Sequence, residues 1–281
     1  MKHSVATLKN IAFEIRKDVL ISLHEAGSGH LGASLGLSDI FTTLYFVFLK
    51  HNPKQPDWPE RDRLVVSIGH VAPALYASLA HAGYFDRQEL MTLRKLGSML
   101  QGHPATAHNV PGLETTAGSL GQGLSIAVGM ALSDKMDYKN RRVVSIHGDG
   151  ELQEGSIWEA AMSAGHYKLN NLIAIVDRNR VQIDGKTEKV MRLEPLKSKW
   201  ESFNWYVLEC NGNNIPDIIN TLEKANEVRN KPIVILANTK MGAGVKSIEK
   251  DHTWHGKPPQ NQEQLNQFLN ELEEAFNVQN G

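Results

Sequence analysis

Short apolar runs alternate with stretches of helical periodicity along most of the chain, and this alternation constrains the fold more than any other feature. The runs are rich in Val, Ile and Leu, as buried strands are. They lie at 64–68, 143–146, 172–176, 206–209 and 233–236. Helical spacing predicts helices over 5–25, 38–49, 73–82, 119–135, 155–167 and 215–229. Repeated strand-helix-strand units predict an α/β fold, with a mainly parallel sheet and helices on both faces.

The balance of charge excludes several classes of partner. Lys and Arg number 30 against 31 Asp and Glu, a net charge of −1, so no field gathers nucleic acid or anionic lipid. No apolar run approaches the roughly 20 residues that span a bilayer, and charged residues interrupt any N-terminal signal sequence. We therefore expect a cytoplasmic protein. A single cysteine, Cys210, excludes an intramolecular disulfide and indicates a buried thiol.

The chain divides by composition into a long first part and a short tail. Residues 1–258 are expected to form one domain, and the Gln- and Asn-rich residues 259–281 a polar tail that is helical and lies on the surface. Segments 52–62 and 102–118 are rich in Pro, Gly, His and Thr and lack periodicity. They are predicted to be long loops, which often carry functional residues.

Polar side chains follow two successive strands of the predicted sheet. Asp149 stands between two glycines directly after the strand 143–146, and Asn179 follows the strand 172–176. The interval between them fits one strand-helix-strand unit, so both should emerge at the carboxyl edge where such sheets bind ligands. A carboxylate, an amide oxygen and a backbone carbonyl suit Mg²⁺, which prefers hard oxygen ligands. The pattern predicts a Mg²⁺-diphosphate site, although Gly-Asp-Gly alone could be only a tight turn.

Four motifs, in this order along the chain, resemble those of transketolases. They are Gly27-Ser28-Gly29-His30-Leu31-Gly32, the stretch from Gly112 to Gly123, Gly148-Asp149-Gly150-Glu151-Leu152-Gln153-Glu154-Gly155, and Trp254-His255-Gly256. One motif alone would be weak, but the ordered set is specific. The resemblance runs from about residue 5 to residue 258. It is greatest with the N-terminal, diphosphate-binding subunit of split transketolases.

The resemblance implies the cofactor and its ligands. The cofactor is thiamine diphosphate with Mg²⁺, which Ca²⁺ or Mn²⁺ can replace, bound in the diphosphate-type domain of the thiamine diphosphate-binding fold. The implied metal ligands are Asp149, Asn179 and the Val181 carbonyl. The implied cofactor contacts are His70, Gly118, Ser119, Leu120, Gly150, Glu154, Asn179 and His255.

Three histidines are implied as catalytic residues. His30 and His255 would meet the carbonyl end of the donor sugar, and His103 the hydroxyl on the carbon whose bond breaks. Glu154 resembles a glutamate that meets its symmetry mate or the neighbouring chain; it could equally be a solvated acid in the first turn of a helix. Ala105 departs from the pattern, because most relatives have an acidic residue after Gly-His-Pro. This difference bears on the sugar rather than on the cofactor.

The implied activity is transfer of a two-carbon ketol unit from a ketose, expected to be a phosphate, to an aldose. This reaction belongs to carbohydrate metabolism and the pentose phosphate pathway. In the family, a glutamate that activates the cofactor lies in a second α/β domain, for which the residues after 258 are too few. We therefore expect a separate C-terminal subunit that carries this glutamate, and a heterotetramer of two copies of each chain.

Several alternatives remain at this stage. The sugar could be a specialised one, branched or sulfonated, or the chain could be a non-catalytic regulatory subunit that has kept the fold. A deoxyxylulose-phosphate synthase or a 2-oxo-acid dehydrogenase fits the motifs less well. A nicotinamide dehydrogenase would rest on Gly121-Gln122-Gly123, but no predicted strand directly precedes it.

Overall fold

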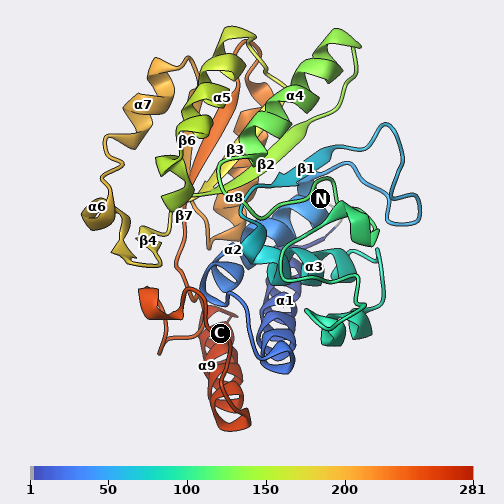
Figure 1. The fold of residues 1–281 in the computed structure, drawn as a ribbon, viewed down its shortest axis with the longest axis vertical. Coiled ribbons are helices and arrows are strands. Elements are labelled where there is room, and N and C mark those ends of the chain that lie inside the picture. Colours follow the sequence, from blue (N-terminus) through green and yellow to red (C-terminus); the bar gives the residue numbers. More distant parts are fainter. Residues whose placement is uncertain (1–2, 281) are drawn as a thin grey trace.

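The computed structural model describes residues 3–280, and its centre is a five-stranded sheet (Figure 1). The strands are β1 (Arg63–Val66), β2 (Val143–Gly148), β3 (Leu172–Asp177), β6 (Tyr206–Asn211) and β7 (Ile233–Asn238). Their order is β1-β2-β3-β7-β6, and every neighbouring pair is parallel. The predicted α/β fold with a mainly parallel sheet is thus confirmed. Two short strands, β4 (Val181–Gln182) and β5 (Gly185–Lys186), form an antiparallel pair outside it.

Alternate side chains of each strand enter two different cores, one on each face of the sheet. Ile173 and Ile175 of β3 belong to the first core, whereas Ala174 and Val176 belong to the second. The first core includes residues of α1 (Val5–Ala26), α2 (Gly32–Thr43), α3 (Ala72–His81) and α8 (Ile215–Glu227). The second includes residues of α4 (Gly123–Met136), α5 (Gly155–His166) and α7 (Leu196–Ser202). Burial on both faces explains why β2, β3 and β7 are continuous apolar runs, whereas the edge strand β6 is partly exposed.

The second helix begins earlier than its sequence indicated. Residues 38–48 are helical, as expected for most of the range 38–49, but α2 begins at Gly32, and Ser38 lies inside it, where its hydroxyl donates to the Ser34 carbonyl at 3.0 Å. The chain continues from α2 into a π-helical turn, Leu44–Phe48. Every residue of α2 is buried, so no polar face marks its start.

The remaining predicted helices occur with ends that differ by a few residues. The largest difference is at α4, which begins at Gly123 instead of residue 119, because Gly121 has a φ of +83° that a helix does not accept. Segments 52–62 and 102–118 contain neither strand nor α-helix, as expected for loops. The short helical elements are α6 (Thr187–Val190) and the 3₁₀ turns Gly69–Val71, Arg87–Thr92, Thr106–His108, Gly150–Gln153 and His252–Trp254.

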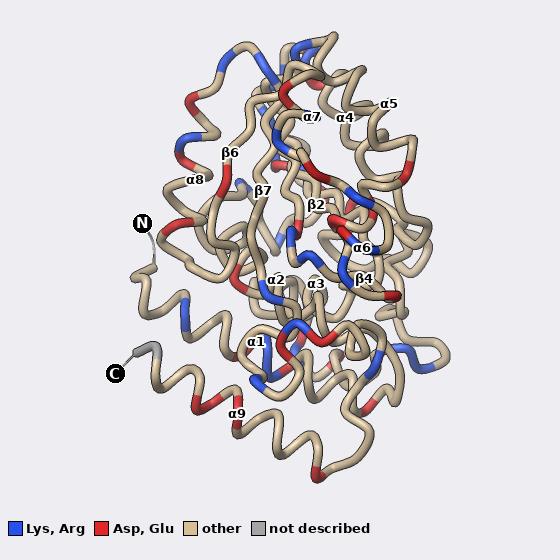
Figure 2. Tube along the Cα trace, turned by 90° about the vertical axis from the view of Figure 1, so that its left-hand side faces the viewer, with Lys and Arg blue, Asp and Glu red and all other residues tan. Residues whose placement is uncertain are grey.

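The last helix, α9 (Gln262–Asn280), lies beside α1 (Figure 2). The ring centres of Phe13 and Phe276 are 4.5 Å apart, with the ring planes tilted by 30°. Leu265, Phe268 and Leu272 are buried, so one side of this helix belongs to the first core. The division of the chain at residue 258 stays a prediction. Lys and Arg are interspersed with Asp and Glu over most of the trace, whereas the charged residues of α9 are all acidic (Figure 2). None of the helices in the described part of the chain is long and apolar enough to cross a bilayer.

Candidate functional site

A cavity of about 220 Å³ opens at the carboxyl ends of β2 and β3. The two strands are neighbours in register, with Gly148 opposite Asp177, so the residues that follow them meet at one edge of the sheet. The cavity is lined by Ala33, Ile68, His70, Leu120, Gly148, Asp149, Gly150, Glu151, Asp177, Asn179, Val181, Gln182, Ile183, Asp184 and His255. The three residues predicted as metal ligands are therefore brought to the same cavity.

The Asp149 side chain is only 1% exposed and is held by the segment that follows β3. Its Oδ2 accepts hydrogen bonds from Arg178 Nη1 at 2.9 Å and from the Arg180 backbone N–H at 2.6 Å. Burial raises the pKa of Asp149 to about 6, and the nearby Arg178 guanidinium acts in the opposite direction without outweighing it. The positive charge of Arg178 therefore does not fully offset the cost of burying this carboxylate.

Asn179 is fixed by hydrogen bonds at both ends of its amide. Its Nδ2 donates to Asp177 Oδ2 at 2.8 Å, and its Oδ1 accepts from the Val181 N–H at 2.8 Å. Burial raises the pKa of Asp177 to about 7, the Thr239 hydroxyl donates to Asp177 and lowers it, and the charge of Asp149 raises it. A cation at this edge would stabilise both carboxylates.

The donor set at this edge fits a hard divalent cation. Asp149 supplies a carboxylate, Asn179 an amide oxygen and Val181 a backbone carbonyl, and all three residues line the cavity. No group of three or more His, Cys, Asp or Glu suited to a metal occurs within residues 3–280. The protein would thus supply few ligands, as is usual for Mg²⁺ that keeps diphosphate oxygens and water.

Four imidazole rings gather beside this cavity from four different loops. The ring centres of His30 and His70 are 5.1 Å apart, those of His70 and His255 5.2 Å, and those of His30 and His103 6.2 Å. Burial first, and then the neighbouring His255, lowers the pKa of His30 to about 4. Burial also lowers the pKa of the other three, so the cluster is neutral at pH 7.

Two ring nitrogens of this cluster have no partner. His30 Nδ1 and His255 Nδ1 are buried without a hydrogen bond. Buried polar atoms are nearly always paired, so these two nitrogens need a partner that the described residues do not supply, and His255 lines the cavity. Neutral imidazoles with a free nitrogen can donate to a sugar oxygen or accept a proton from it.

The other predicted contacts are divided between two cavities. Leu120 and Gly150 line the first. His103, Gly118 and Ser119 line an adjacent cavity of about 480 Å³ together with the end of β1. Glu154 is exposed at the N-terminal end of α5 and lines neither cavity. Its Cβ and Cγ lie against Gly121, where an added Cβ would approach them to 2.8 and 3.1 Å.

Sequence reasoning assigns no role to three buried charged residues of the site. Asp177 and Arg178 directly precede Asn179, and Glu151 lies two residues after Asp149. Arg178 is 3% exposed and also pairs with Glu188 and Glu194, which follow β4 and β5 in the chain. Because a charged residue is normally solvated, no signal in the sequence marks these three residues as buried.

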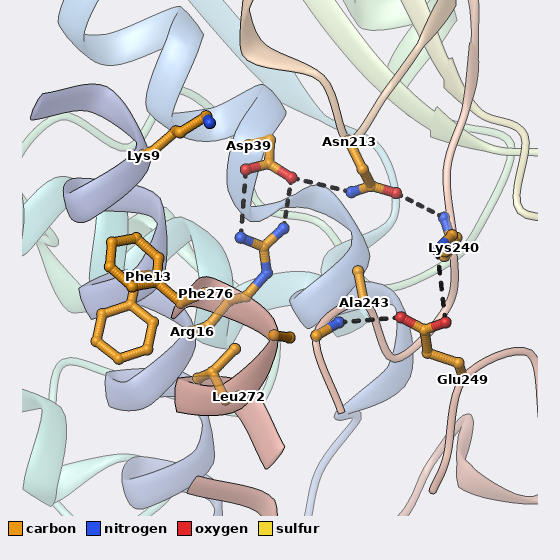
Figure 3. Close-up of a pocket in the computed structure, with 12 residues that line it drawn as sticks. Lys9, Phe13, Arg16, Asp39, Asn213, Lys240, Ala243, Glu249, Leu272 and Phe276 are labelled. Atoms are coloured by element: carbon orange, nitrogen blue, oxygen red, sulfur yellow. Dashed lines mark hydrogen bonds and ion pairs between the residues drawn. The ribbon is translucent and has the colours of Figure 1, made fainter. Parts of the chain in front are cut away.

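The loop that carries His255 is held in place by a series of polar contacts. They run through Arg16, Asp39, Asn213, Lys240 and Glu249 (Figure 3). Asn213 joins two segments, since its Nδ2 donates to Asp39 Oδ2 at 3.0 Å and its Oδ1 accepts from the Lys240 N–H at 2.8 Å. The small cavity among these residues, about 70 Å³, is bordered by charged groups that pair with one another. We assign it a structural role.

Gly-Gln-Gly at 121–123 does not have the surroundings of a dinucleotide-binding turn. Within the described residues, the strand before it ends at Val66 and the next begins at Val143. The segment between Val66 and Gly121 contains α3 and a long loop, so no strand leads into these glycines. This absence removes the basis for a nicotinamide dehydrogenase.

Together, the parallel sheet and the oxygen donors at its carboxyl edge fit the class of α/β domains that bind a diphosphate cofactor. A family model for the thiamine diphosphate binding domain of transketolase matches residues 8–279. The chain therefore belongs to the transketolase family, as the domain that binds thiamine diphosphate. This assignment confirms the predicted family, and with it the prediction of a transferase of the split transketolase type.

Relatives and solved structures agree with this assignment. The chain is 46% identical over 249 residues to the 6-deoxy-6-sulfo-D-fructose transketolase subunit SqwG of a Clostridium species, covering 89% of this chain and 90% of that one. It is 41% identical over 272 residues to an apulose-4-phosphate transketolase subunit of Phocaeicola vulgatus, covering 97% and 96%. The crystal structure of Campylobacter jejuni transketolase superposes with a TM-score of 0.89 and 36% identity, covering 97% of this chain. The chain spans 43% of the length of that transketolase.

Proposed function

We propose that this chain is the diphosphate-binding subunit of a two-chain transketolase, which transfers a two-carbon ketol unit from an anionic ketose to an aldose. The observation that carries the proposal is the meeting of two groups at one cavity. Oxygen donors from the ends of β2 and β3 lie on one side, and His70 and His255 of the neutral histidine cluster line the same cavity. Such a site can hold a metal-bound diphosphate next to a sugar.

Mg²⁺ would be held by Asp149, Asn179 and the Val181 carbonyl, and the diphosphate would lie against the backbone of Gly150 and the 118–120 turn. When bound, thiamine diphosphate supplies the electron sink for cleavage of the bond between C2 and C3 of the ketose. Glycine at 150 fits this role because a Cβ there would approach the Gln182 side chain to 2.8 Å, so the backbone is left bare towards the cavity.

The histidines are proposed to position the sugar and to move its protons. His30 and His255 each have a free, buried Nδ1 that can form a hydrogen bond with the carbonyl end of the donor. His103, whose pKa is lowered by burial and then by the charge of Arg94, is neutral and can accept the proton of the donor hydroxyl.

The second chain is proposed to supply the glutamate that activates the cofactor, within an assembly of two copies of each chain. The names of the relatives designate subunits, which supports a partner. The exposed faces of α4 and α5 offer large apolar side chains for such contacts, namely Ile126 (37%), Met136 (70%) and Met162 (59%). Glu154 is exposed at the N-terminal end of α5.

Two classes of donor are proposed, and the comparisons support the second. One is a ketose phosphate of the pentose phosphate pathway. The other is a specialised sugar, because two relatives that match along nearly their full length are named for a sulfonated ketose and for apulose 4-phosphate. Ala105 places a methyl group where an acidic side chain would stand in the cavity that His103 lines. The loss of a negative charge favours an anionic substrate there.

The test is co-expression of this chain with its genomic neighbour and a screen of donors. Xylulose 5-phosphate, apulose 4-phosphate and 6-deoxy-6-sulfofructose would each be offered with an aldose acceptor, thiamine diphosphate and MgCl₂. We expect ketol transfer by the pair and none by either chain alone. Full activity of this chain alone would refute the two-chain arrangement. Cofactor binding without transfer from any of several ketoses would instead support a regulatory subunit.

A further inference from the structure

The Glu151 carboxylate is buried where three segments of the chain meet. It lies in the 3₁₀ turn that follows Asp149 and is 2% exposed. It accepts hydrogen bonds from the Ser67 hydroxyl, the Gly121 N–H, the Gly148 N–H and His147 Nδ1. These donors belong to the end of β1, the turn before α4 and the end of β2.

The four hydrogen bonds divide evenly between the two carboxylate oxygens. Oε1 receives the Ser67 hydroxyl and the Gly121 N–H, the latter at 2.7 Å. Oε2 receives the Gly148 N–H and His147 Nδ1, both at 3.2 Å. A buried carboxylate with this many donors is firmly fixed, because hydrogen bonds to a charged acceptor are stronger than neutral ones. Glu151 thus joins the turn at Gly121 to the turn at Gly148.

The turn before α4, residues 117–122, forms no helix or strand. Besides the Glu151 carboxylate, it is held by the Ser156 hydroxyl, which donates to the Gly121 carbonyl at 2.9 Å, by the Ala117 N–H, which donates to the Pro104 carbonyl at 2.9 Å, and by partial burial of Leu120 against the first core. A Cβ at Gly69 would lie 2.5 Å from the Ala117 carbonyl oxygen, and one at Gly123 would lie 2.4 Å from Ser67 Cβ. The Gly123 N–H also donates to the Ser67 hydroxyl at 3.0 Å, so the contacts of Ser67 and Glu151 are one network.

We infer that Glu151 is a positioning residue for the cofactor: it sets the 118–121 turn against Gly148–Gly150, so that both backbones face one cavity. Leu120 and Gly150 line that cavity from the two sides. The inference rests on the proposed function, because the ligand it serves is the diphosphate. The arrangement of the two turns requires Glu151 as an acceptor, and its negative charge strengthens the hydrogen bonds without being required for their geometry.

Two substitutions separate the acceptor from the charge. Glu151→Ala removes all four hydrogen bonds. In Glu151→Gln, the amide oxygen still accepts from Ser67 and Gly121, and the amide N–H can donate to His147 Nδ1 in its other tautomer; only the Gly148 N–H loses its acceptor. His147 Nε2 then donates to the Ser145 hydroxyl, 2.8 Å away. The Gln variant should therefore restore most of what the Ala variant loses.

The matched control is Asp134→Ala. Asp134 is 1% exposed and pairs with Arg141, but it lies in the last turn of α4, at the opposite end of that helix from the site. Both Ala variants remove a buried carboxylate, so they should be destabilised to a similar extent. Only Glu151→Ala should change cofactor binding.

Thiamine diphosphate binding to the full chain would be measured by calorimetry at saturating MgCl₂, alone and in the complex with its partner. For Glu151→Ala we expect a dissociation constant raised about ten-fold or more, and for Glu151→Gln and Asp134→Ala a change within about three-fold. In the active complex, the KM for thiamine diphosphate should rise while kcat at saturating cofactor is retained. Equal affinity of Glu151→Ala and wild type would overturn the inference, as would a Gln variant as weak as the Ala variant.

Amide hydrogen exchange gives a second, cofactor-independent reading. The Gly121 and Gly123 amides should exchange faster in Glu151→Ala than in wild type and Asp134→Ala. Unchanged exchange would overturn the inference. If wild type binds no thiamine diphosphate alone or in the complex, the proposed function fails. The role of Glu151 in positioning the turn is then tested by exchange of the Gly121 and Gly123 amides alone.

Discussion

Replacing Asp149 by Asn should leave the cofactor-free chain at least as stable as wild type at pH 7.5 while removing its affinity for Mg²⁺-thiamine diphosphate. The side chain is 1% exposed, and burial raises its pKa from 3.8 to about 6. A shift of this size disfavours the ionised form by about 3 kcal/mol relative to an exposed carboxylate. An amide has nearly the same shape and carries no charge, so it avoids this cost.

In Asp149→Asn, the loss of the ion pair with Arg178 limits the gain in stability. Arg178 keeps Glu188 at 3.0 Å and Glu194 at 2.9 Å, so its guanidinium is not left buried without a partner. The net effect should lie between about 0 and 3 kcal/mol of added stability, or an increase in Tm of up to several degrees. Because the folded-state pKa of Asp149 is raised, its stabilising contribution is present below pH 3.8 and is lost as the pH rises through 6. The advantage of the Asn variant should therefore disappear at about pH 4.

The assay is thermal unfolding of both proteins at pH 4 and pH 7.5, with and without thiamine diphosphate and MgCl₂. Wild type should gain Tm on addition of both ligands at pH 7.5, and Asp149→Asn should not, since ligand binding to the folded state is what raises Tm. The reasoning is refuted by an Asn variant that is clearly less stable than wild type without ligand. An Asn variant that still gains Tm with the cofactor would refute the metal assignment.

Three further predictions concern other parts of the molecule. The pKa of His30 is lowered to about 4, so this side chain stays neutral in the folded protein, whereas in the unfolded chain it takes up a proton below pH 6.5; the free energy of unfolding therefore falls as the pH is lowered from 6.5 to 4. In urea titrations, His30→Gln should reduce this fall by about 2 kcal/mol. An unchanged dependence of the free energy of unfolding on pH would contradict the prediction. Gly165→Ala should destabilise the protein by about 2–4 kcal/mol, because the added Cβ would lie 1.9 Å from the Phe203 carbonyl oxygen. Gly129→Ala should stabilise it by about 0.5–1 kcal/mol, because the added Cβ would meet nothing within 4 Å and alanine favours the helix. Similar urea midpoints for the two variants would be inconsistent with this packing. His103→Asn should lower kcat/KM for the donor about 10²–10⁴-fold with thiamine diphosphate affinity unchanged, and a comparable loss of affinity would place His103 at the cofactor instead.

The sheet could be predicted because most of its strands are buried on both faces, with the edge strand β6 as the exception. Each of the five predicted strands overlaps a strand of the sheet, since runs such as Ile173–Val176 have no polar side to disguise them. The order of strands was beyond the sequence, because β7 pairs with β3 through contacts between residues about 60 positions apart. The start of α2 was also beyond it, because burial on all sides removes the polar face that marks a surface helix.

The candidate site could be predicted where it follows a strand and not where it depends on packing. Asp149 and Asn179 were placed together by one crossover rule, and they line one cavity. Arg178 and Glu151 were not found, because a charged residue in sequence is normally solvated and only the folded chain shows that both are buried among partners. The clustering of four histidines likewise required the loops to be placed.

A crystal structure of the complex with thiamine diphosphate and MgCl₂ tests the central claim most directly. The account predicts Mg²⁺ at about 2.0–2.1 Å from an Asp149 carboxylate oxygen, the Asn179 amide oxygen and the Val181 carbonyl, with two diphosphate oxygens completing its coordination. A cofactor bound elsewhere, or a diphosphate in this cavity with Asp149 and Asn179 turned away from the metal, would contradict it.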